Sequence, residues 1–319
     1  MSTRNSNNNS SRKTNKLKLA LLTIETIGIL ILFSNQFYAQ KKEAAQNDNV
    51  FGVAFLKSMY LNINYNDAFA AIKVYVSELQ RQLLSGYEMK PIMYNDAKDL
   101  VDNFYKENLA DITLNPVDFQ KYRSKLPIYP VLVSSGLNGP LEKYLILVRK
   151  DDGIKQLSDL KDKKLGTLQN EMNPIPDMWL EVIIGSNRLP NKSKLFKYMT
   201  FGKTEAQLIL SLFFKQLDVC VVSESAFETM SELNPQIKNQ IQILQSSPGY
   251  PMAVSAFTDK FKDSKFSSNL FNILIKLNTY SKGKQLFALT KTVKIVPYKE
   301  EYMDSLKKLI RDYNKLRSN

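Results

Sequence analysis

Two loops of this 319-residue chain carry polar side chains directly after a predicted buried strand. In open α/β sheets, ligands bind at the carboxyl ends of the strands. The apolar run at 164–168 ends in the amides Gln169 and Asn170, and the run at 110–114 ends at Asn115, before a proline. Amide side chains donate and accept hydrogen bonds, so these loops predict ligand binding. Asn115 is equally well explained as a turn residue.

The composition removes most catalytic chemistry. Histidine is absent, which takes away the usual general base and the commonest metal ligand. The single cysteine, Cys220, lies in an apolar run and is predicted to be a core residue. One cysteine cannot form a disulfide or a thiolate metal cluster within the chain. Neither a Walker-type nor a dinucleotide glycine motif occurs, so we expect no enzyme, no catalytic residue, no metal site and no cofactor.

The chain has a formal charge of +13 and a pI of about 9.4. Such a charge can indicate nucleic acid or an anionic membrane surface as a partner. The excess is spread along the sequence, as in KDKK, SKGK and LKKLIRDYNKLR, and no basic cluster alternates with stacking aromatic residues. We therefore expect no nucleic-acid partner.

Residues 1–40 are predicted to be a signal peptide or an N-terminal membrane anchor. Basic residues precede an apolar run at 19–33, which is the layout of a secretory signal. A spanning helix usually needs about 20 apolar residues. Cleavage after Ala39 would suit the small residue required there, and an uncleaved segment would contact the membrane. Residues 41–49 are predicted to be a linker, and the protein is expected to be periplasmic or otherwise extracytoplasmic, with anchoring to the inner membrane as the alternative.

The folded region is predicted to begin at about Val50 and to alternate strands with helices, which indicates an α/β fold. The clearest helix is 66–84, where apolar residues recur at three- and four-residue steps and Asn66 or Asp67 could be the cap. Further helices are predicted at 96–105, 178–185, 204–214, 267–280 and 300–317. Strands are predicted at 50–55, 89–94, 110–114, 128–133, 144–148, 164–168, 217–222, 241–244 and 252–257.

Several motifs carry a resemblance to a known family. The stretch DGIKQLSDLKDKKLG at 152–166 resembles a signature of the phosphonate-type substrate-binding proteins of ABC importers, which have the type II periplasmic-binding fold. The segments YLILVRK, LNP, FGKTEA, QLDVCVV and VPY stand in the order in which similar motifs occur in that family. The resemblance covers about residues 50–310. It implies two α/β lobes, a ligand cleft between them and two crossover segments.

The resemblance also implies a domain organisation and a function. Residues 50–140 and 248–319 would form lobe 1, and residues 141–247 would form lobe 2. The protein would be the extracytoplasmic substrate-binding component of an ABC-type phosphate/phosphonate-like transport system. It would bind a small molecule by lobe closure and deliver it to an ABC permease. A ligand-sensing subunit for a membrane sensor protein and a degenerate scaffold that binds no ligand are the alternatives.

Candidate ligand-binding residues follow from the same resemblance. Phe55 stands after the first strand, where the family usually has proline, and Tyr94 could replace a ligand-facing tyrosine. Lys203 and Thr204 lie where the family has a glycine-rich turn with a histidine.

The second lobe and its exit supply three more candidates. Ser223 and Glu224 follow the QLDVCVV strand, where a carboxylate would select an amine or hydroxyl on the ligand; capping of the next helix is the alternative. Tyr250 lies in the second crossover.

The ligand is expected to differ from that of phosphonate binders. In the family, serine and threonine hydroxyls and a helix N-terminus hold the anion. The corresponding stretch here, 167–177, lacks most of these hydroxyls and contains Glu171 and Asp177. In a partly dry cleft two such charges would repel an anion by several kcal/mol. We therefore predict altered specificity, towards a ligand with hydroxyl or amine groups.

Overall fold

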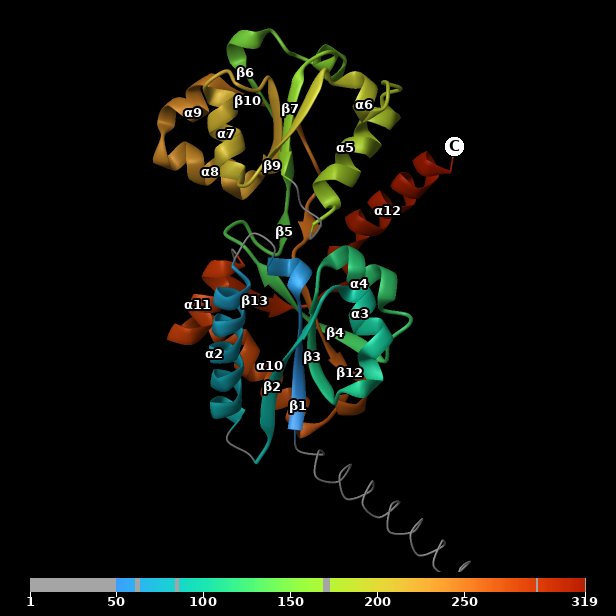
Figure 1. Cartoon of the computed structure of the whole chain (residues 1–319), viewed down its shortest axis with the longest axis vertical. Coiled ribbons are helices and arrows are strands. Elements are labelled where there is room, and N and C mark those ends of the chain that lie inside the picture. Colours follow the sequence, from blue (N-terminus) through green and yellow to red (C-terminus); the bar gives the residue numbers. More distant parts are fainter. Residues whose placement is uncertain (1–49, 61–63, 84–85, 169–172, 291, 319) are drawn as a thin grey trace, which may run out of the picture. The chain divides into compact units, whose positions relative to one another are not determined.

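The structure is a computed structural model that describes residues 50–60, 64–83, 86–168, 173–290 and 292–318. Residues 51–319 form one compact unit, and Figure 1 shows its elements in sequence colours. The predicted signal peptide or anchor and the linker lie outside the described residues, as do Gln169 and Asn170.

A six-stranded mixed sheet contains the first buried strand. In spatial order its strands are β13 (Lys294–Pro297), β4 (Ile128–Ser135), β12 (Val254–Thr258), β3 (Leu109–Leu114), β1 (Val50–Leu56) and β2 (Glu88–Tyr94). The strands β1 and β3 are parallel, whereas β12 runs antiparallel to both β3 and β4, and β13 runs antiparallel to β4.

Helices cover both faces of this sheet. Successive side chains of β1 point to opposite faces, so apolar residues on both faces need helices to bury them. Val53 and Phe55 enter an apolar cluster with α2 (Tyr65–Leu83), α10 (Lys265–Ile275) and α11 (Ser281–Leu289). Ala54 and Leu56 enter a second cluster with α3 (Ala97–Asn103) and α4 (Pro116–Tyr122). Figure 1 shows α2 and α11 on one side of the sheet and α3 and α4 on the other.

The predicted helix 66–84 is observed one residue earlier, and its predicted cap is wrong. The helix α2 begins at Tyr65. The side-chain oxygen of Asn64 accepts a hydrogen bond of 2.9 Å from the backbone N–H of Asn66. Asn64 therefore occupies the capping position that the sequence pattern assigned to Asn66 or Asp67.

A five-stranded sheet forms the middle of the chain. In spatial order its strands are β10 (Ile241–Ser246), β6 (Tyr144–Arg149), β9 (Val219–Ser223), β7 (Lys164–Leu168) and β8 (Tyr198–Gly202). The strands β7, β8 and β9 are parallel, and β6 is antiparallel to β9 and β10. One face packs on the helices α7 (Glu205–Phe213), α8 (Glu224–Leu233) and α9 (Pro235–Gln240). The other face packs on α5 (Ile175–Ser186) and α6 (Lys192–Leu195).

The prediction that Cys220 is a core residue is confirmed, and Trp179 is buried on the opposite face of the sheet. Cys220 is fully buried in the cluster under α7, and burial raises the pKa of its thiol. Trp179 of α5 is 4% exposed and packs in the apolar cluster on the other face.

Two short strands connect the sheets. The strand β5 (Leu141–Glu142) lies between β4 and β6 in the sequence, and β11 (Tyr250–Pro251) lies between β10 and β12. They pair with each other in an antiparallel ladder, and the rings of Tyr144 and Tyr250 stack beside them, with centroids 6.4 Å apart. These connectors match the two predicted crossover segments. The lobe boundaries stay a prediction.

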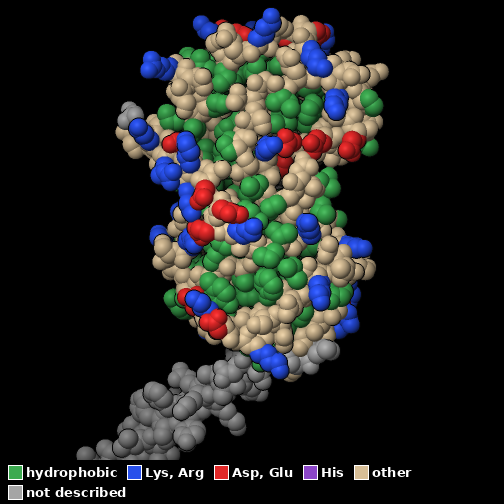
Figure 2. Space-filling model, turned by 180° about the vertical axis from the view of Figure 1, so that it is seen from behind, with side chains coloured by type: hydrophobic (Ala, Val, Ile, Leu, Met, Phe, Trp, Pro, Cys, Tyr) green, Lys and Arg blue, Asp and Glu red, His purple; other side chains and the backbone are tan. Residues whose placement is uncertain are grey.

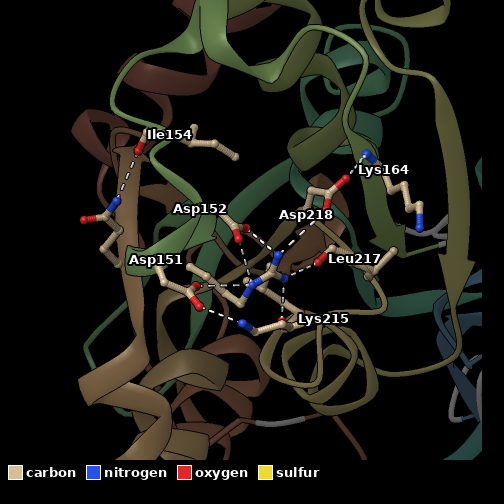
Figure 3. Close-up of polar contacts among 10 residues, drawn as sticks. Asp151, Asp152, Ile154, Lys164, Lys215, Leu217 and Asp218 are labelled. Carbon is tan, nitrogen blue, oxygen red and sulfur yellow. Dashed lines mark hydrogen bonds and ion pairs between the residues drawn. The ribbon is translucent and has the colours of Figure 1, made fainter.

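The family-like stretch after β6 is a structural anchor (Figure 3). The side chain of Arg149 is 6% exposed; its guanidinium donates to the carbonyl oxygens of Leu212, at 2.9 Å, and Leu217 and pairs with Asp152 at 2.5 Å. A second ion pair, between Lys215 and Asp151, spans 2.7 Å. These contacts bind the turn after β6 to the turn between α7 and β9, at the end of the sheet away from the connectors.

The C-terminal helix α12 (Asp304–Arg317) packs against α5. Gly185 allows close contact there, because a Cβ atom at this position would lie 2.6 Å from Cδ2 of Leu316. Within the described ranges, no helix has both the length and the apolar character to cross a membrane.

Candidate functional site

The carboxyl ends of β7, β8 and β9 meet at one edge of the five-stranded sheet, because these strands are parallel. We call this the carboxyl edge. It faces the connector β5, since the last residue of β9, Ser223, pairs with the first residue of β6, Tyr144. The helices α5, α7 and α8 follow these three strands in the chain. Helix N-termini favour anions when their N–H groups are free.

Two predicted site residues at this edge are helix caps. The hydroxyl of Thr204 accepts a hydrogen bond of 3.1 Å from the N–H of Gln207 in α7. The hydroxyl of Ser223 accepts one of 3.3 Å from the N–H of Ala226 in α8. The capping alternative for Ser223 is therefore what the structure shows. Thr204 does the same for α7, and the ligand contacts of both residues stay predictions.

Lys203 is exposed and precedes the α7 cap. Its backbone N–H donates to the side-chain oxygen of Gln207 at 3.0 Å. Among the described residues no carboxylate lies within ion-pair distance of its ammonium group. This lysine is therefore available to solvent.

Three carboxylates lie near one another at the carboxyl edge. Glu142 of β5 accepts hydrogen bonds from the N–H and the hydroxyl of Ser225, at 3.2 and 2.7 Å. Glu205 is 8% exposed and accepts one of 2.7 Å from the N–H of Ser223. Burial raises the pKa of Glu142, and the negative charges of Glu205 and Glu224 raise it further. The edge is therefore locally acidic.

The N-terminus of α8 has its N–H groups already bonded. The N–H of Glu224 donates to the carbonyl of Lys143 at 2.8 Å, and the next two N–H groups donate to Glu142 and to the Ser223 hydroxyl. The predicted site residue Glu224 also pairs with Lys143 at 3.5 Å. An anion at this helix would have to displace these acceptors.

Two buried tyrosines border the edge at the connectors. The phenol oxygen of Tyr144 accepts a hydrogen bond from the side-chain amide of Asn173, and burial raises its pKa. The predicted site residue Tyr250 is 2% exposed, and burial raises its pKa to about 12. Both phenols stay neutral at physiological pH. The Tyr250 phenol also feels the negative charge of Asp312 in α12, and its contact with a ligand stays a prediction.

The six-stranded sheet places the other predicted residues in its core or in a cap. Phe55 is 4% exposed and packs edge-on against Tyr75 at 6.0 Å. Asn115 caps α4: its oxygen accepts from the N–H of Asp118 at 2.9 Å, and its amide nitrogen donates to the Asp118 carboxylate. This is the turn role that the sequence left open for Asn115.

Tyr94 also lies in this core. Its side chain is 5% exposed, and burial raises the pKa of the phenol to about 12. The buried hydroxyl has no hydrogen-bond partner among the residues described. For Phe55, Tyr94 and Asn115, contact with a ligand stays a prediction.

Sequence reasoning missed several polar residues at the strand ends. Lys57 directly follows β1; its ammonium donates to Asn95 at 2.9 Å and lies over the ring of Tyr65 at 5.3 Å. A cation at the end of a buried strand could have been noticed in the sequence. Glu142 and Ser225 gave no such signal, because β5 is two residues long and Ser225 lies inside a helix.

A groove of about 410 Å³ runs along β8 and holds none of the predicted site residues. Its lining includes Lys164, Tyr198, Phe201 and Gln207. No group of three or more acidic or cysteine side chains suited to a metal ion occurs among the described residues.

Comparison with known proteins identifies the family. The family model described as "ABC transporter, phosphonate, periplasmic substrate-binding protein" matches residues 64–302, which is most of the chain. Among curated protein sequences no significant match is found.

Solved structures show the same fold. A Xanthomonas citri protein with bound ATP is 15% identical, covers 85% of this chain and 99% of its own, and has a TM-score of 0.59. PhnD1 from Prochlorococcus marinus in complex with methylphosphonate is 15% identical, with coverages of 84% and 99% and a TM-score of 0.56. A binding-protein component of an ABC phosphonate transporter from Pseudomonas aeruginosa is 14% identical, with coverages of 83% and 86% and a TM-score of 0.53. At these identities the likeness establishes the type II periplasmic-binding fold alone.

The family consists of substrate-binding transport proteins, not enzymes. Its members take a small-molecule ligand, work with an ABC permease and act outside the cytoplasm. On the match over residues 64–302, the chain belongs to the family of phosphonate-type periplasmic substrate-binding proteins of ABC transporters.

Proposed function

We propose that this protein is a substrate-binding component with altered specificity, whose ligand carries amine or hydroxyl groups in place of a phosphonate. The observation that carries the proposal is the acidic carboxyl edge, where the carboxylates of Glu142 and Glu205 both accept hydrogen bonds at the N-terminus of α8, beside Glu224. Carboxylates accept hydrogen bonds and attract cations. They repel phosphonates, which are anionic.

Two further observations support this ligand class. The N–H groups at the start of α8, which could hold an anion, are bonded to protein acceptors. The carboxylates of Glu142 and Glu205 accept hydrogen bonds and, when ionised, have no donor of their own. A ligand that donates hydrogen bonds fits such acceptors better than one that needs donors.

We propose further that the ligand is held by lobe closure about the connectors β5 and β11. Glu142 belongs to β5 itself and bonds to α8 through Ser225. A ligand at this edge would therefore contact the connector as well as the sheet. Closure requires that the ligand bind the closed form more tightly than the open form.

The test is thermal unfolding of the purified protein with a panel of amines, amino acids, nucleosides, polyamines, phosphate and methylphosphonate. A ligand at about 100 times its Kd adds about 2.7 kcal/mol to the free energy of unfolding. The proposal predicts a rise in Tm with an amine or a polyhydroxyl compound and none with methylphosphonate. A rise with methylphosphonate contradicts the ligand class. No rise with any compound favours the scaffold alternative.

Substitution at the carboxyl edge then locates the site. Glu142→Gln keeps the shape of the side chain and removes its charge, so it should weaken binding of an amine at least tenfold. Glu88→Gln, at the exposed first position of β2 in the six-stranded sheet, is the matched control and should leave the Kd unchanged. Equal effects of the two substitutions would place the ligand elsewhere.

A further inference from the structure

Five lysines converge at the end of the five-stranded sheet away from the connectors. Lys161, Lys163 and Lys164 form the turn into β7, and Lys194 and Lys197 flank the turn into β8. Two backbone hydrogen bonds join these turns, from the N–H of Asp162 to the oxygen of Leu195 at 2.8 Å and from the N–H of Lys197 to the oxygen of Lys163 at 3.1 Å. We call these five residues the lysine surface.

The sequence alone did not show this concentration, because the two turns are more than 30 residues apart. The register of β7 and β8 brings them together, with Lys164 opposite Tyr198. In Figure 2, Lys and Arg side chains lie around the top of the view with some Asp and Glu side chains between them, and the strand β7 begins at this end in Figure 1.

The lysine surface retains most of its charge. Across the described part of the chain, none of its five ammonium groups forms an ion pair with a carboxylate. The neighbouring acidic residues are mostly engaged elsewhere. Asp218 accepts from the backbone N–H of Lys164 at 2.9 Å, and it shares Arg149 with Asp151 and Asp152. Asp159 accepts from the backbone N–H of Lys155, and Asp162 lies between the lysines.

The types of side chain indicate what the surface contacts. All five cations are lysines, which are strongly hydrated point charges, whereas arginine is the residue that recognises single carboxylates and phosphates through its fork of donors. Lysines on two turns therefore suit a diffuse layer of negative charge. Beside them Tyr198 is 61% exposed, and tyrosine is enriched where a protein meets the headgroup layer of a membrane.

We propose that the lysine surface binds an anionic phospholipid membrane. The family acts outside the cytoplasm with a permease that is embedded in a membrane, so such a surface is within reach of this protein. Each lysine near an anionic bilayer adds to the attraction, and the attraction falls off within a Debye length. The contact involves the end of the sheet opposite the carboxyl edge, so it leaves the proposed ligand site open and does not depend on the identity of the ligand.

The test is sedimentation of the full chain with sucrose-loaded vesicles. Vesicles of phosphatidylcholine alone are compared with vesicles that contain about 40% phosphatidylglycerol, at low salt and at about 0.5 M salt, where screening shortens the Debye length to a few ångströms. The variant Lys161→Glu/Lys163→Glu/Lys197→Glu reverses the surface. The control Lys265→Glu/Lys284→Glu/Lys294→Glu makes the same change in net charge at exposed positions on other elements.

We expect the wild type and the control variant to bind the anionic vesicles at low salt. The surface variant should lose at least tenfold in partitioning, and binding should fall at high salt. Equal loss in both variants would show that only net charge matters and overturn the proposal. Full binding by the surface variant would assign the contact to another part of the chain, and no vesicle binding by any protein would exclude a lipid occupant. Circular dichroism of both variants verifies that they fold.

Discussion

At the scale of single residues, the same side-chain types serve two purposes at the ends of strands. Asn115, Thr204 and Ser223 were predicted to contact a ligand, and in the structure each caps the following helix. The sequence could not separate the two roles, because both need an oxygen atom beside a helix N-terminus. The carboxylates Glu142 and Glu205 were missed as candidates, since their proximity arises only from the fold.

Asp111 carries a prediction about pH. It is fully buried in β3, where burial raises its pKa to about 6, and the hydroxyl of Ser255 donates to it at 2.6 Å. The pKa of Asp111 is higher in the folded protein than in the unfolded chain. The protonated carboxyl group therefore contributes stability that is fully present below about pH 4. Stability is then lost as the pH rises through about 6. The difference between the two pKa values corresponds to about 3 kcal/mol of stability.

Urea unfolding of the wild type and Asp111→Asn at pH 4, 5, 6 and 7 tests this. The free energy of unfolding of the wild type should fall relative to that of the variant as the pH rises. Ser255→Ala removes a donor that favours the anion, so the fall should become larger. Parallel curves for the wild type and Asp111→Asn would contradict the account.

Arg149 carries a prediction about stability. Arg149→Met leaves the carboxylate of Asp152 and two carbonyl oxygens without their buried partner. Loss of one partner of a buried pair costs about 3 to 5 kcal/mol. The control Lys215→Ala removes an ion pair between two exposed side chains and should cost less than about 1 kcal/mol. Chemical denaturation measures both, and equal losses would show that Arg149 is not the anchor.

At the scale of elements, periodicity located most of the fold. The strands β1, β3 and β7 and the helix α2 are observed within one or two residues of their predicted bounds. The helix α11 was missed, because Gly283 lies within it and lowers its helix propensity. That glycine is required by packing: a Cβ atom there would lie 2.2 Å from the carbonyl oxygen of Leu277. Contact with another segment is not visible in a local pattern.

Two glycines test the packing of helices on the five-stranded sheet. At Gly166 of β7 a Cβ atom would lie 2.4 Å from Leu217 and 2.9 Å from Leu208, both buried. Gly166→Ala should therefore destabilise the protein by about 1 to 3 kcal/mol. At Gly185 the nearest atoms belong to the partly exposed end of Leu316, and alanine has the higher helix propensity.

Gly185→Ala should accordingly change the free energy of unfolding by less than about 1 kcal/mol. Thermal or urea unfolding of the two variants gives the comparison. A larger loss at Gly185 than at Gly166 would mean that the contact between α5 and α12 is the more rigid of the two.

At the scale of the whole molecule, the order of weak motifs was more informative than any one of them. The motif order predicted a type II periplasmic-binding fold and the family, and both are confirmed. The ligand was not predictable to the same degree, because the family signature at 152–166 serves as a scaffold around Arg149. Under the proposed function, specificity would depend instead on side chains from β5, α7 and α8, which the fold brings together.

The most direct test of the proposed specificity is a calorimetric titration of methylphosphonate into the wild-type protein and into Glu142→Gln/Glu224→Gln. The acidic carboxyl edge predicts no saturable heat with the wild type, because its carboxylates repel the anion. It predicts weak but measurable binding once two of these charges are removed. Saturable binding of methylphosphonate to the wild type, lost or unchanged in the variant, would contradict the account and make the protein a phosphonate binder like its relatives.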